Sequence, residues 1–136
     1  MNKIFTILIA FVSIGLVSSC TEADTMDAVL SSAKAEGKIV MLELGSVGCI
    51  PCEQMKPVMQ KLRDTYKGKL EVIFVDVRVD RPSAVRFGVT LIPTQVFLDK
   101  RGKEFHRHVG FHDFDEIVPV LYKAGLPREV SVKEKR

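Results

Sequence analysis

Two cysteines separated by two residues carry the strongest chemical signal in this chain of 136 residues. Cys49 and Cys52 enclose Ile50 and Pro51, at the point where an apolar run of strand length gives way to a helical pattern. A helix N-terminus carries free N–H groups and partial positive charge, so it stabilises a nucleophilic thiolate. Pro51 suits the first helical turn, where a missing N–H leaves no bond unmade. We therefore expect the outer Cys49 to attack disulfides and the deeper Cys52 to resolve the mixed disulfide.

Two other uses of such a pair need consideration, a zinc half-site and an inert structural disulfide. Zinc takes four ligands, and the pair supplies two. His108 and His112 could complete the set, but 55 residues separate Cys52 from His108, far more than in a zinc finger. Thiolate and imidazole also suit copper. A copper or zinc binding module, or metallochaperone, that uses Cys49, Cys52 and a histidine is therefore the alternative function.

The surrounding segments alternate between strand-like and helical patterns. Two almost continuous apolar runs, Ile39–Leu44 and Leu70–Val77, predict strands buried on both faces. The helix between them makes these strands parallel, whereas the turn signal Asp99–Gly102 predicts an antiparallel hairpin. The sequence thus predicts an α/β domain with a mixed sheet and helices on both faces. The other predicted elements are helices over 26–36, 51–66 and 82–87, hairpin strands over 95–98 and 104–109, and a last helix that follows the cap Asp113 and contains Phe114, Ile117, Val118 and Leu121.

Composition excludes several classes of protein. With 46% hydrophobic and 27% charged residues, the chain is neither disordered nor fibrous, and its length fits one core. A net charge of +3 without a long basic stripe gives no support for nucleic-acid binding. Three cysteines are too few for a disulfide-stapled miniprotein, and the odd number indicates a separate role for one of them.

The N-terminus explains that third cysteine. Lys3 precedes fourteen uncharged residues, 4–17, which are too short for a membrane span but typical of a signal peptide. The next residues resemble a bacterial lipobox, with an aliphatic residue and two small residues before Cys20. In proteins with that motif the chain is cleaved before the cysteine, which then carries lipid. We therefore expect a membrane-anchored, extracytoplasmic lipoprotein in the periplasm or cell envelope.

The expected layout is a signal peptide over 1–19, a tether over 20–24, the folded domain over 25–125 and a flexible tail over 126–136. A plain secretory signal with an incidental Cys20, or an uncleaved anchor, are the alternatives for the N-terminus. Each of them places the domain outside the cytoplasm.

The domain resembles the thioredoxin superfamily over nearly all of residues 25–125. The resemblance rests on the Cys-x-Pro-Cys centre, the proline Pro57 five residues later and the Ile-Pro-Thr segment that begins at Ile92. It implies a thioredoxin-like fold with a central four-stranded sheet, and thiol–disulfide oxidoreductase activity. It implies no cofactor other than a redox-active Cys49–Cys52 disulfide, and no metal. The matching segments are Val40–Pro57, Val75–Val89, Leu91–Glu104 and His108–Gly110.

The resemblance also assigns roles to residues outside the dithiol. It implies a cis Ile92–Pro93 peptide bond, and it places Ile92, Pro93 and Pro51 at the surface that binds substrate. It identifies Glu43, where thioredoxins carry a buried acid, with proton transfer to and from Cys52. Burial should raise the pKa of Glu43 toward neutrality, as such a transfer requires. The alternative is a glutamate at a sheet edge that reaches solvent.

Several positions depart from the family's pattern. Gly48 stands where a tryptophan usually precedes the first cysteine, and Gly45 replaces a second common aromatic residue. Phe74 occupies the position of the lysine that usually pairs with the buried acid. The active-site rim is therefore expected to be bare, and the proton relay to be altered. We further expect Met55 and Met59 to fill the core, and three histidines, His106, His108 and His112, to be solvated at the surface.

The resemblance finally suggests partners. The substrates would be disulfide-bearing envelope proteins, such as apocytochrome c, and a membrane thiol–disulfide carrier would supply electrons. The membrane itself is a partner through the lipid on Cys20. We expect a monomer that does not bind nucleic acid and acts as a reductant.

Overall fold

The computed structural model describes residues 22–128, in which helices and strands alternate. Each helix and strand expected there from the sequence is present, with boundaries that differ by a few residues. No helix within 22–128 is both long and apolar enough to cross a membrane. The elements are α1 (Glu22–Ala35), β1 (Ile39–Gly45), α2 (Ile50–Thr65), β2 (Leu70–Asp76), α3 (Arg81–Arg86), β3 (Thr94–Leu98), β4 (Glu104–Val109) and α4 (Phe114–Lys123).

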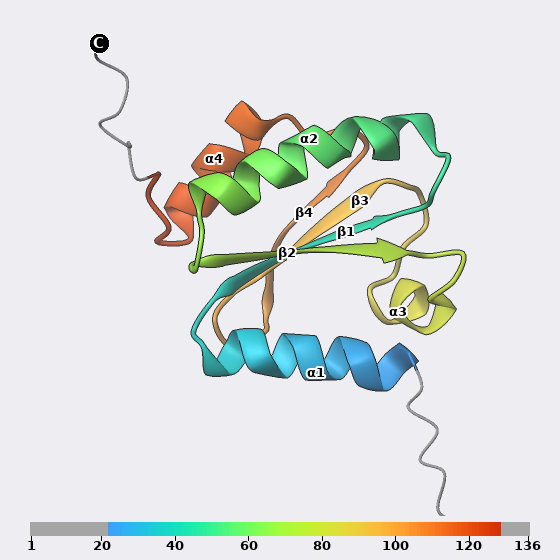
Figure 1. Cartoon of the computed structure of the whole chain (residues 1–136), viewed down its shortest axis with the longest axis horizontal. Coiled ribbons are helices and arrows are strands. Elements are labelled where there is room, and N and C mark those ends of the chain that lie inside the picture. Colours follow the sequence, from blue (N-terminus) through green and yellow to red (C-terminus); the bar gives the residue numbers. More distant parts are fainter. Residues whose placement is uncertain (1–21, 129–136) are drawn as a thin grey trace, which may run out of the picture.

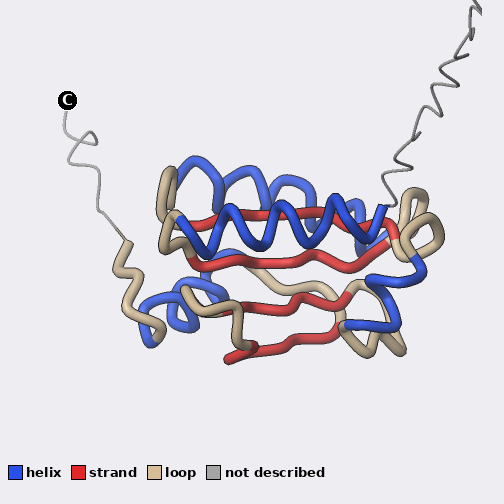
Figure 2. Tube along the Cα trace, turned by 90° about the horizontal axis from the view of Figure 1, so that it is seen from below, coloured by secondary structure: helices blue, strands red, loops and turns tan. Residues whose placement is uncertain are grey.

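The four strands form one mixed sheet in the order β2-β1-β3-β4. β1 pairs in parallel with β2 and antiparallel with β3, and β3 pairs antiparallel with β4. Helices α2 and α4 cover one face of the sheet, while α1 and α3 lie on the other (Figure 1). Figure 2, seen from the α1 side, shows the strands lying side by side beneath that helix. This is the α/β arrangement of a thioredoxin-like fold.

Strand β2 is less buried than the sequence predicts. All seven residues of β1 are buried, whereas β2 alternates between buried and half-buried residues. The expectation of burial on both faces was wrong for β2 because this strand lies at the edge of the sheet. An apolar run does not reveal whether a strand is central or at the edge. That position depends on strand order, in which β3 pairs with the other side of β1.

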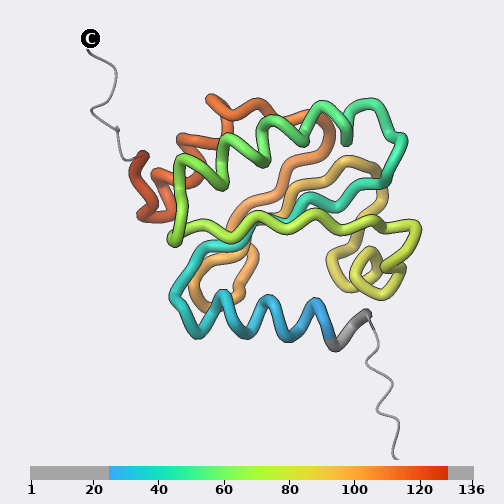
Figure 3. The backbone as a smooth tube through the Cα atoms, in the orientation of Figure 1, coloured from blue at the N-terminus to red at the C-terminus, as the bar shows by residue number. Residues whose placement is uncertain are grey.

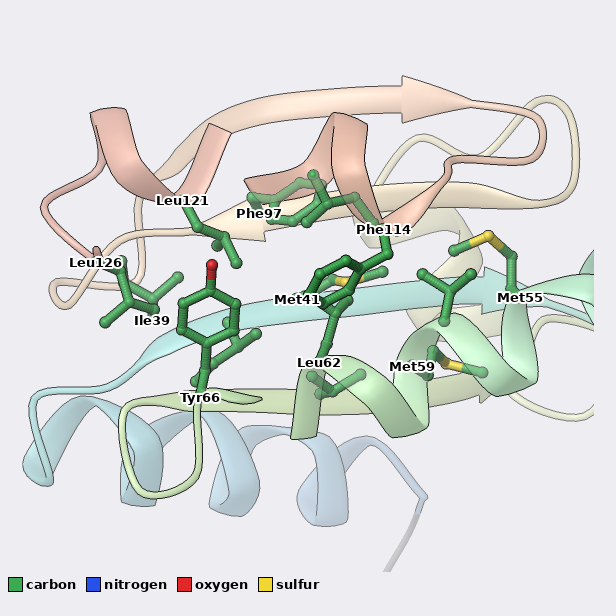
Figure 4. Close-up of a cluster of buried hydrophobic side chains, with 14 residues drawn as sticks. Ile39, Met41, Met55, Met59, Leu62, Tyr66, Phe97, Phe114, Leu121 and Leu126 are labelled. Carbon is green, nitrogen blue, oxygen red and sulfur yellow. The ribbon is translucent and has the colours of Figure 1, made fainter. Parts of the chain in front are cut away.

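The larger part of the core lies between the sheet and helices α2 and α4. Figure 4 shows Met41 and Phe97 from the sheet meeting Leu62 from α2 and Leu121 from α4. Met55 and Met59 are buried in this cluster, which confirms their expected role as core residues. A second cluster on the opposite face packs α1 against β1 and β3.

The boundaries of the folded part differ from the expected layout at both ends. Helix α1 begins at Glu22, so three residues of the expected tether are helical. Leu126 is 4% exposed and joins the core, and its N–H donates to the Leu121 carbonyl over 2.9 Å. The expected tail over 126–136 was therefore one residue too long at its start, since apolar packing fixes Leu126. The two ends of the described chain leave the molecule on opposite sides (Figure 3).

Helix α4 confirms its expected start. The Asp113 side chain accepts a hydrogen bond from the Phe114 N–H, and a capping box with Glu116 completes the first turn. Capping supplies partners for N–H groups that the helix leaves free. The helix continues through Pro119 to Lys123 without a break.

Candidate active site

The dithiol lies at the N-terminus of α2, directly after the loop that leaves β1. Gly48 has a φ of +79°, in the left-handed region that favours glycine. A tryptophan would be strained in that conformation, which gives a physical reason for its absence here. Cys49 then takes the N-cap position with φ −84° and ψ 116°, and Pro51 lies in the first helical turn as predicted.

The two cysteines differ in burial as the sequence predicts. Cys49 is half-buried, whereas Cys52 is 2% exposed, and both are free thiols. Burial and a hydrogen bond with Cys49 raise the pKa of Cys52 to about 11, against a small opposing contribution from the Ser46 backbone. At neutral pH Cys52 is therefore protonated, and it can act as a nucleophile only if a nearby base takes its proton.

Glu43 is the candidate for such a base. It lies on the central strand β1 and is completely buried, which excludes a position at a sheet edge. Burial raises its pKa to about 7, and the neighbouring Gln95 amide offsets that rise only in part. The charge of Glu43 in turn helps to raise the pKa of Cys52, so the two groups lie close enough to interact.

The residues that pair with Glu43 on the two neighbouring strands, Phe74 and Gln95, are both uncharged. On β2 that residue is Phe74, and neither of the carboxyl oxygens of Glu43 has a hydrogen-bond partner among the described residues. An ionised carboxylate is costly in such a setting. The absence of a lysine at this position therefore matches the altered proton relay expected from the sequence.

Gly45 allows Cys52 to pack directly against the end of β1. A Cβ atom at Gly45 would lie 3.0 Å from Cys52 Sγ, 3.2 Å from Cys52 Cβ and 3.3 Å from the Phe74 ring. These distances are shorter than ordinary van der Waals contacts, so a side chain at Gly45 would require Cys52 or Phe74 to move by a few tenths of an ångström. The Phe74 ring occupies part of the space beside it.

Asp76 holds the loop that leads to Cys49. Its carboxylate accepts hydrogen bonds from the Val47 N–H over 3.1 Å and the Arg78 N–H over 2.9 Å. Those two backbone bonds, Arg78 first, lower the pKa of Asp76. The aspartate therefore ties the active-site loop to the end of β2.

The Ile92–Pro93 peptide bond is cis. Pro93 is buried and Ile92 is half-buried, and the pairing of Leu44 with Thr94 places this segment beside the end of β1. Thr94 Oγ1 donates to the Leu91 carbonyl over 2.6 Å, which closes the turn. The segment therefore presents its backbone next to the loop that carries the dithiol.

An open groove adjoins this cis-proline segment. It runs between the segment and α3, and it has a volume of about 560 Å³. Its lining combines apolar side chains with two arginines, and includes Arg78, Arg81, Val85, Leu91 and Ile92.

The three histidines gather on one face instead of being solvated. His106 and His108 are half-buried, and His112 is 4% exposed with its ring stacked on His108 at 4.0 Å between centroids. The expectation of solvation was wrong for His112 because the loop before α4 folds back under α2. There the His112 N–H donates to Met55 Sδ over 3.3 Å.

Within residues 22–128 no group of three or more histidine, cysteine, aspartate or glutamate side chains is placed to hold a metal ion. The described part of the chain thus does not bring Cys49, Cys52 and a histidine together as a ligand set. Cys20, the expected lipidation site, lies outside the described residues.

Sequence reasoning missed the Gln95 side chain. It is completely buried between strands, opposite Glu43 on β1 and His108 on β4. A glutamine inside an otherwise apolar strand pattern is the signal that could have identified it.

Comparison with known proteins agrees with this geometry. A family model for a thioredoxin-like domain matches residues 26–125. A thioredoxin of Staphylococcus aureus is 29% identical over 91 residues, which span 67% of this chain and 86% of that protein.

Solved structures give the same result. Thioredoxin NaTrxh of Nicotiana alata superimposes with a TM-score of 0.66 at 29% identity, covering 79% of this chain and 88% of that one. Fasciola hepatica thioredoxin matches with a TM-score of 0.66 at 24% identity, covering 76% of this chain and 93% of that one, and supports the fold. With its family model, fold and dithiol in agreement, the chain belongs to the thioredoxin-like family of thiol–disulfide oxidoreductases.

Proposed function

We propose that this protein reduces disulfide bonds of other proteins outside the cytoplasm, while anchored to a membrane by lipid on Cys20. The observation that carries the proposal is the unequal pair of thiols. Cys49 is accessible at the N-terminus of α2, whereas Cys52 is buried next to Glu43, a base with a pKa of about 7.

The reaction proceeds in two exchanges. The Cys49 thiolate attacks one sulfur of the substrate disulfide, and the other sulfur leaves as a thiolate that takes a proton from water. Glu43 then removes the proton of Cys52, whose sulfur attacks Cys49 and releases the second substrate thiol. The substrate gains two electrons and two protons, and the protein ends with a Cys49–Cys52 disulfide. No cofactor takes part.

The surface around Cys49 supports an extended polypeptide as substrate. The backbone at Ile92 can pair with such a chain in the manner of strand addition. The adjoining groove supplies apolar contacts, and Arg78 and Arg81 favour acidic side chains. A membrane thiol–disulfide carrier would return the electrons, and apocytochrome c is one substrate that fits the proposed location.

Single-cysteine variants test the roles of the thiols. Cys52→Ser should attack substrate but fail to release it, so mixed disulfides should accumulate on Cys49. Cys49→Ser should neither reduce nor trap substrate, because the buried Cys52 cannot reach it. Mass spectrometry of trapped complexes separates these outcomes, and equal trapping by both variants would contradict the assignment.

The redox potential tests whether the protein donates electrons. Ile50 and Pro51 place no cationic side chain between the cysteines, so the thiolate lacks the additional stabilisation that makes a dithiol oxidising. We expect a potential nearer about −270 mV, as in thioredoxin, than about −120 mV, as in a strong oxidase. Equilibration against glutathione buffers measures it. A value above roughly −180 mV, the level of disulfide isomerase, would favour an oxidase or isomerase.

A further inference from the structure

Glu43 belongs to a row of side chains that crosses the sheet. It pairs with Gln95 on β3, and Gln95 pairs with His108 on β4. Residues directly opposite each other in antiparallel strands project to the same face and lie in contact range. Met41 and Phe97, two residues further along β1 and β3, pack in the core beneath α2 and α4, so this row faces the same helices.

Gln95 is a buried polar side chain whose bonding capacity is only partly used. It is 0% exposed, and its Nε2 donates to the Gly110 carbonyl over 3.1 Å, while its Oε1 has no partner. Both oxygens of Glu43 are likewise without partners among the described residues. A buried amide is unfavourable unless its groups are hydrogen-bonded. The carboxyl group of Glu43, directly opposite on β1, is placed where it can become the missing partner.

The Gln95 amide is held in place from the substrate side of the molecule. Gly110 accepts from Gln95 through its carbonyl, and its own N–H donates to the Pro93 carbonyl over 2.8 Å. A continuous set of hydrogen bonds therefore runs from the cis-proline segment to Gln95. Rotation of the amide toward or away from Glu43 is restricted by this anchor.

We infer that Gln95 is a positioning residue for the proton transfer between Cys52 and Glu43, through an amide anchored on Gly110. This inference rests on the proposed function. Before the transfer, the Glu43 carboxylate accepts a hydrogen bond from the Gln95 N–H that is not bonded to Gly110. The S–H bond of Cys52 then breaks, and its proton moves to Glu43. The acid formed by the transfer can donate its proton to Gln95 Oε1. An amide can therefore hydrogen-bond to both the ionised and the protonated form of Glu43, whereas an apolar side chain can bond to neither.

The Gln95→Met variant tests this role, because methionine has a similar length but no N–H donor. The Glu43 titration is followed by NMR of ¹³C-labelled glutamate carboxyl carbons in the reduced protein, with Glu43→Gln identifying the signal. A hydrogen bond to a charged group is strong enough that its loss should move the midpoint upward by about one pH unit or more. The pH profile of mixed-disulfide resolution should shift in the same direction.

Val96→Ala is the matched control, because Val96 is the next residue of β3, equally buried, and packs on the opposite face. It should leave the Glu43 midpoint unchanged. In a Glu43→Gln background, Gln95→Met should cause no further shift of the pH profile. An unchanged Glu43 midpoint in folded Gln95→Met would overturn the inference.

A second NMR measurement tests the contact between Gln95 and Glu43 without any substitution. In the unaltered protein, the ¹⁵N-labelled Gln95 side-chain resonances should titrate with the same midpoint as Glu43, which tests the contact even if Gln95→Met does not fold. Absence of that titration would count against the inference. Neither NMR measurement needs a substrate, so a failure of the proposed disulfide reduction would be seen separately.

Discussion

At the scale of single residues, the protein keeps several ionisable groups, Glu43 and His112 among them, in an interior that favours their neutral forms. Glu43 and His112 are both buried, and burial moves their pKa values in opposite directions. Each shift makes stability depend on pH, because the folded and unfolded chains then bind different numbers of protons. The dependence has opposite sign for the two residues.

Glu43 should lower stability in alkaline solution. Its pKa is about 7 in the folded chain and 4.5 without burial, so the folded chain binds more protons between these values. Stability is therefore lost as pH rises through that window. The free energy of unfolding of Glu43→Gln, relative to the parent protein, should be about 2–3 kcal/mol more favourable to the folded state at pH ~8.5 than at pH ~5. Urea unfolding of the reduced protein measures this difference, and an equal effect at both pH values would contradict it.

His112 should lower stability in acid. Burial, assisted by His108, lowers its pKa from 6.5 to about 4, so the unfolded chain binds more protons between these values. Stability is lost as pH falls through that window. The free energy of unfolding of His112→Leu, relative to the parent protein, should be about 2 kcal/mol more favourable to the folded state at pH ~4.5 than at pH ~7.5, because leucine does not titrate. The same shift in a variant of the exposed Lys100 would argue against a role of burial.

At the scale of elements, the active site depends on how closely α2 approaches the end of β1. The approach is possible because Gly45 has no side chain, and because Asp76 fixes the intervening loop at Val47. Cys52 thereby lies next to the strand that carries Glu43. The chemistry of the dithiol is thus set by the packing of one helix on one strand.

Gly45→Ala should disturb this packing. The added Cβ would approach Cys52 Sγ to 3.0 Å, so α2 must move or Cys52 must change its rotamer. Overpacking of this kind typically costs about 1–3 kcal/mol. We expect lower stability and slower resolution of mixed disulfides, measured by quenching a Cys49-linked complex over time. Ser46→Ala is the control, because the Ser46 hydroxyl has no hydrogen-bond partner within residues 22–128 and its loss should leave resolution intact.

At the scale of the whole molecule, the proposed function joins the folded domain to a membrane through its N-terminal segment. Residues 22–128 fold around two apolar clusters on the faces of one sheet, and α1 follows directly after the N-terminal segment. Helix α1 runs back along β1, so its first turn lies at the same end of the sheet as the dithiol, on the opposite face (Figure 1). The lipobox resemblance locates the attachment at Cys20.

Cys20→Ala should release the protein from the membrane fraction or block its maturation. In the proposed function lipid on Cys20 would provide the anchor, and stable anchoring needs more than one acyl chain. Fractionation and metabolic labelling with a fatty acid measure both effects. Ser18→Ala, which keeps a small residue in the motif, should remain lipidated. Normal processing and membrane binding of Cys20→Ala would show that the lipobox interpretation is wrong.

The sequence by itself determined the parts of this protein that depend on local pattern. Apolar runs, helical patterns and the turn Asp99–Gly102 predicted the elements, and the Cys-x-Pro-Cys spacing predicted the dithiol at a helix N-terminus. These features depend on neighbours along the chain, so they can be read without the fold. The cis state of Pro93 was predicted only through the family resemblance, because local sequence leaves an X-Pro bond mostly trans.

Only the tertiary structure decided which residues meet across the sheet. The edge position of β2, the burial of His112, the contact of Gly45 with Cys52 and the place of Gln95 opposite Glu43 all follow from strand order and helix docking. Most of the residues involved lie far apart in sequence, and no local pattern encodes how the strands pair or how a helix docks on them. Burial then sets the pKa of Glu43, because removal of water acts only once helix and sheet have closed over it.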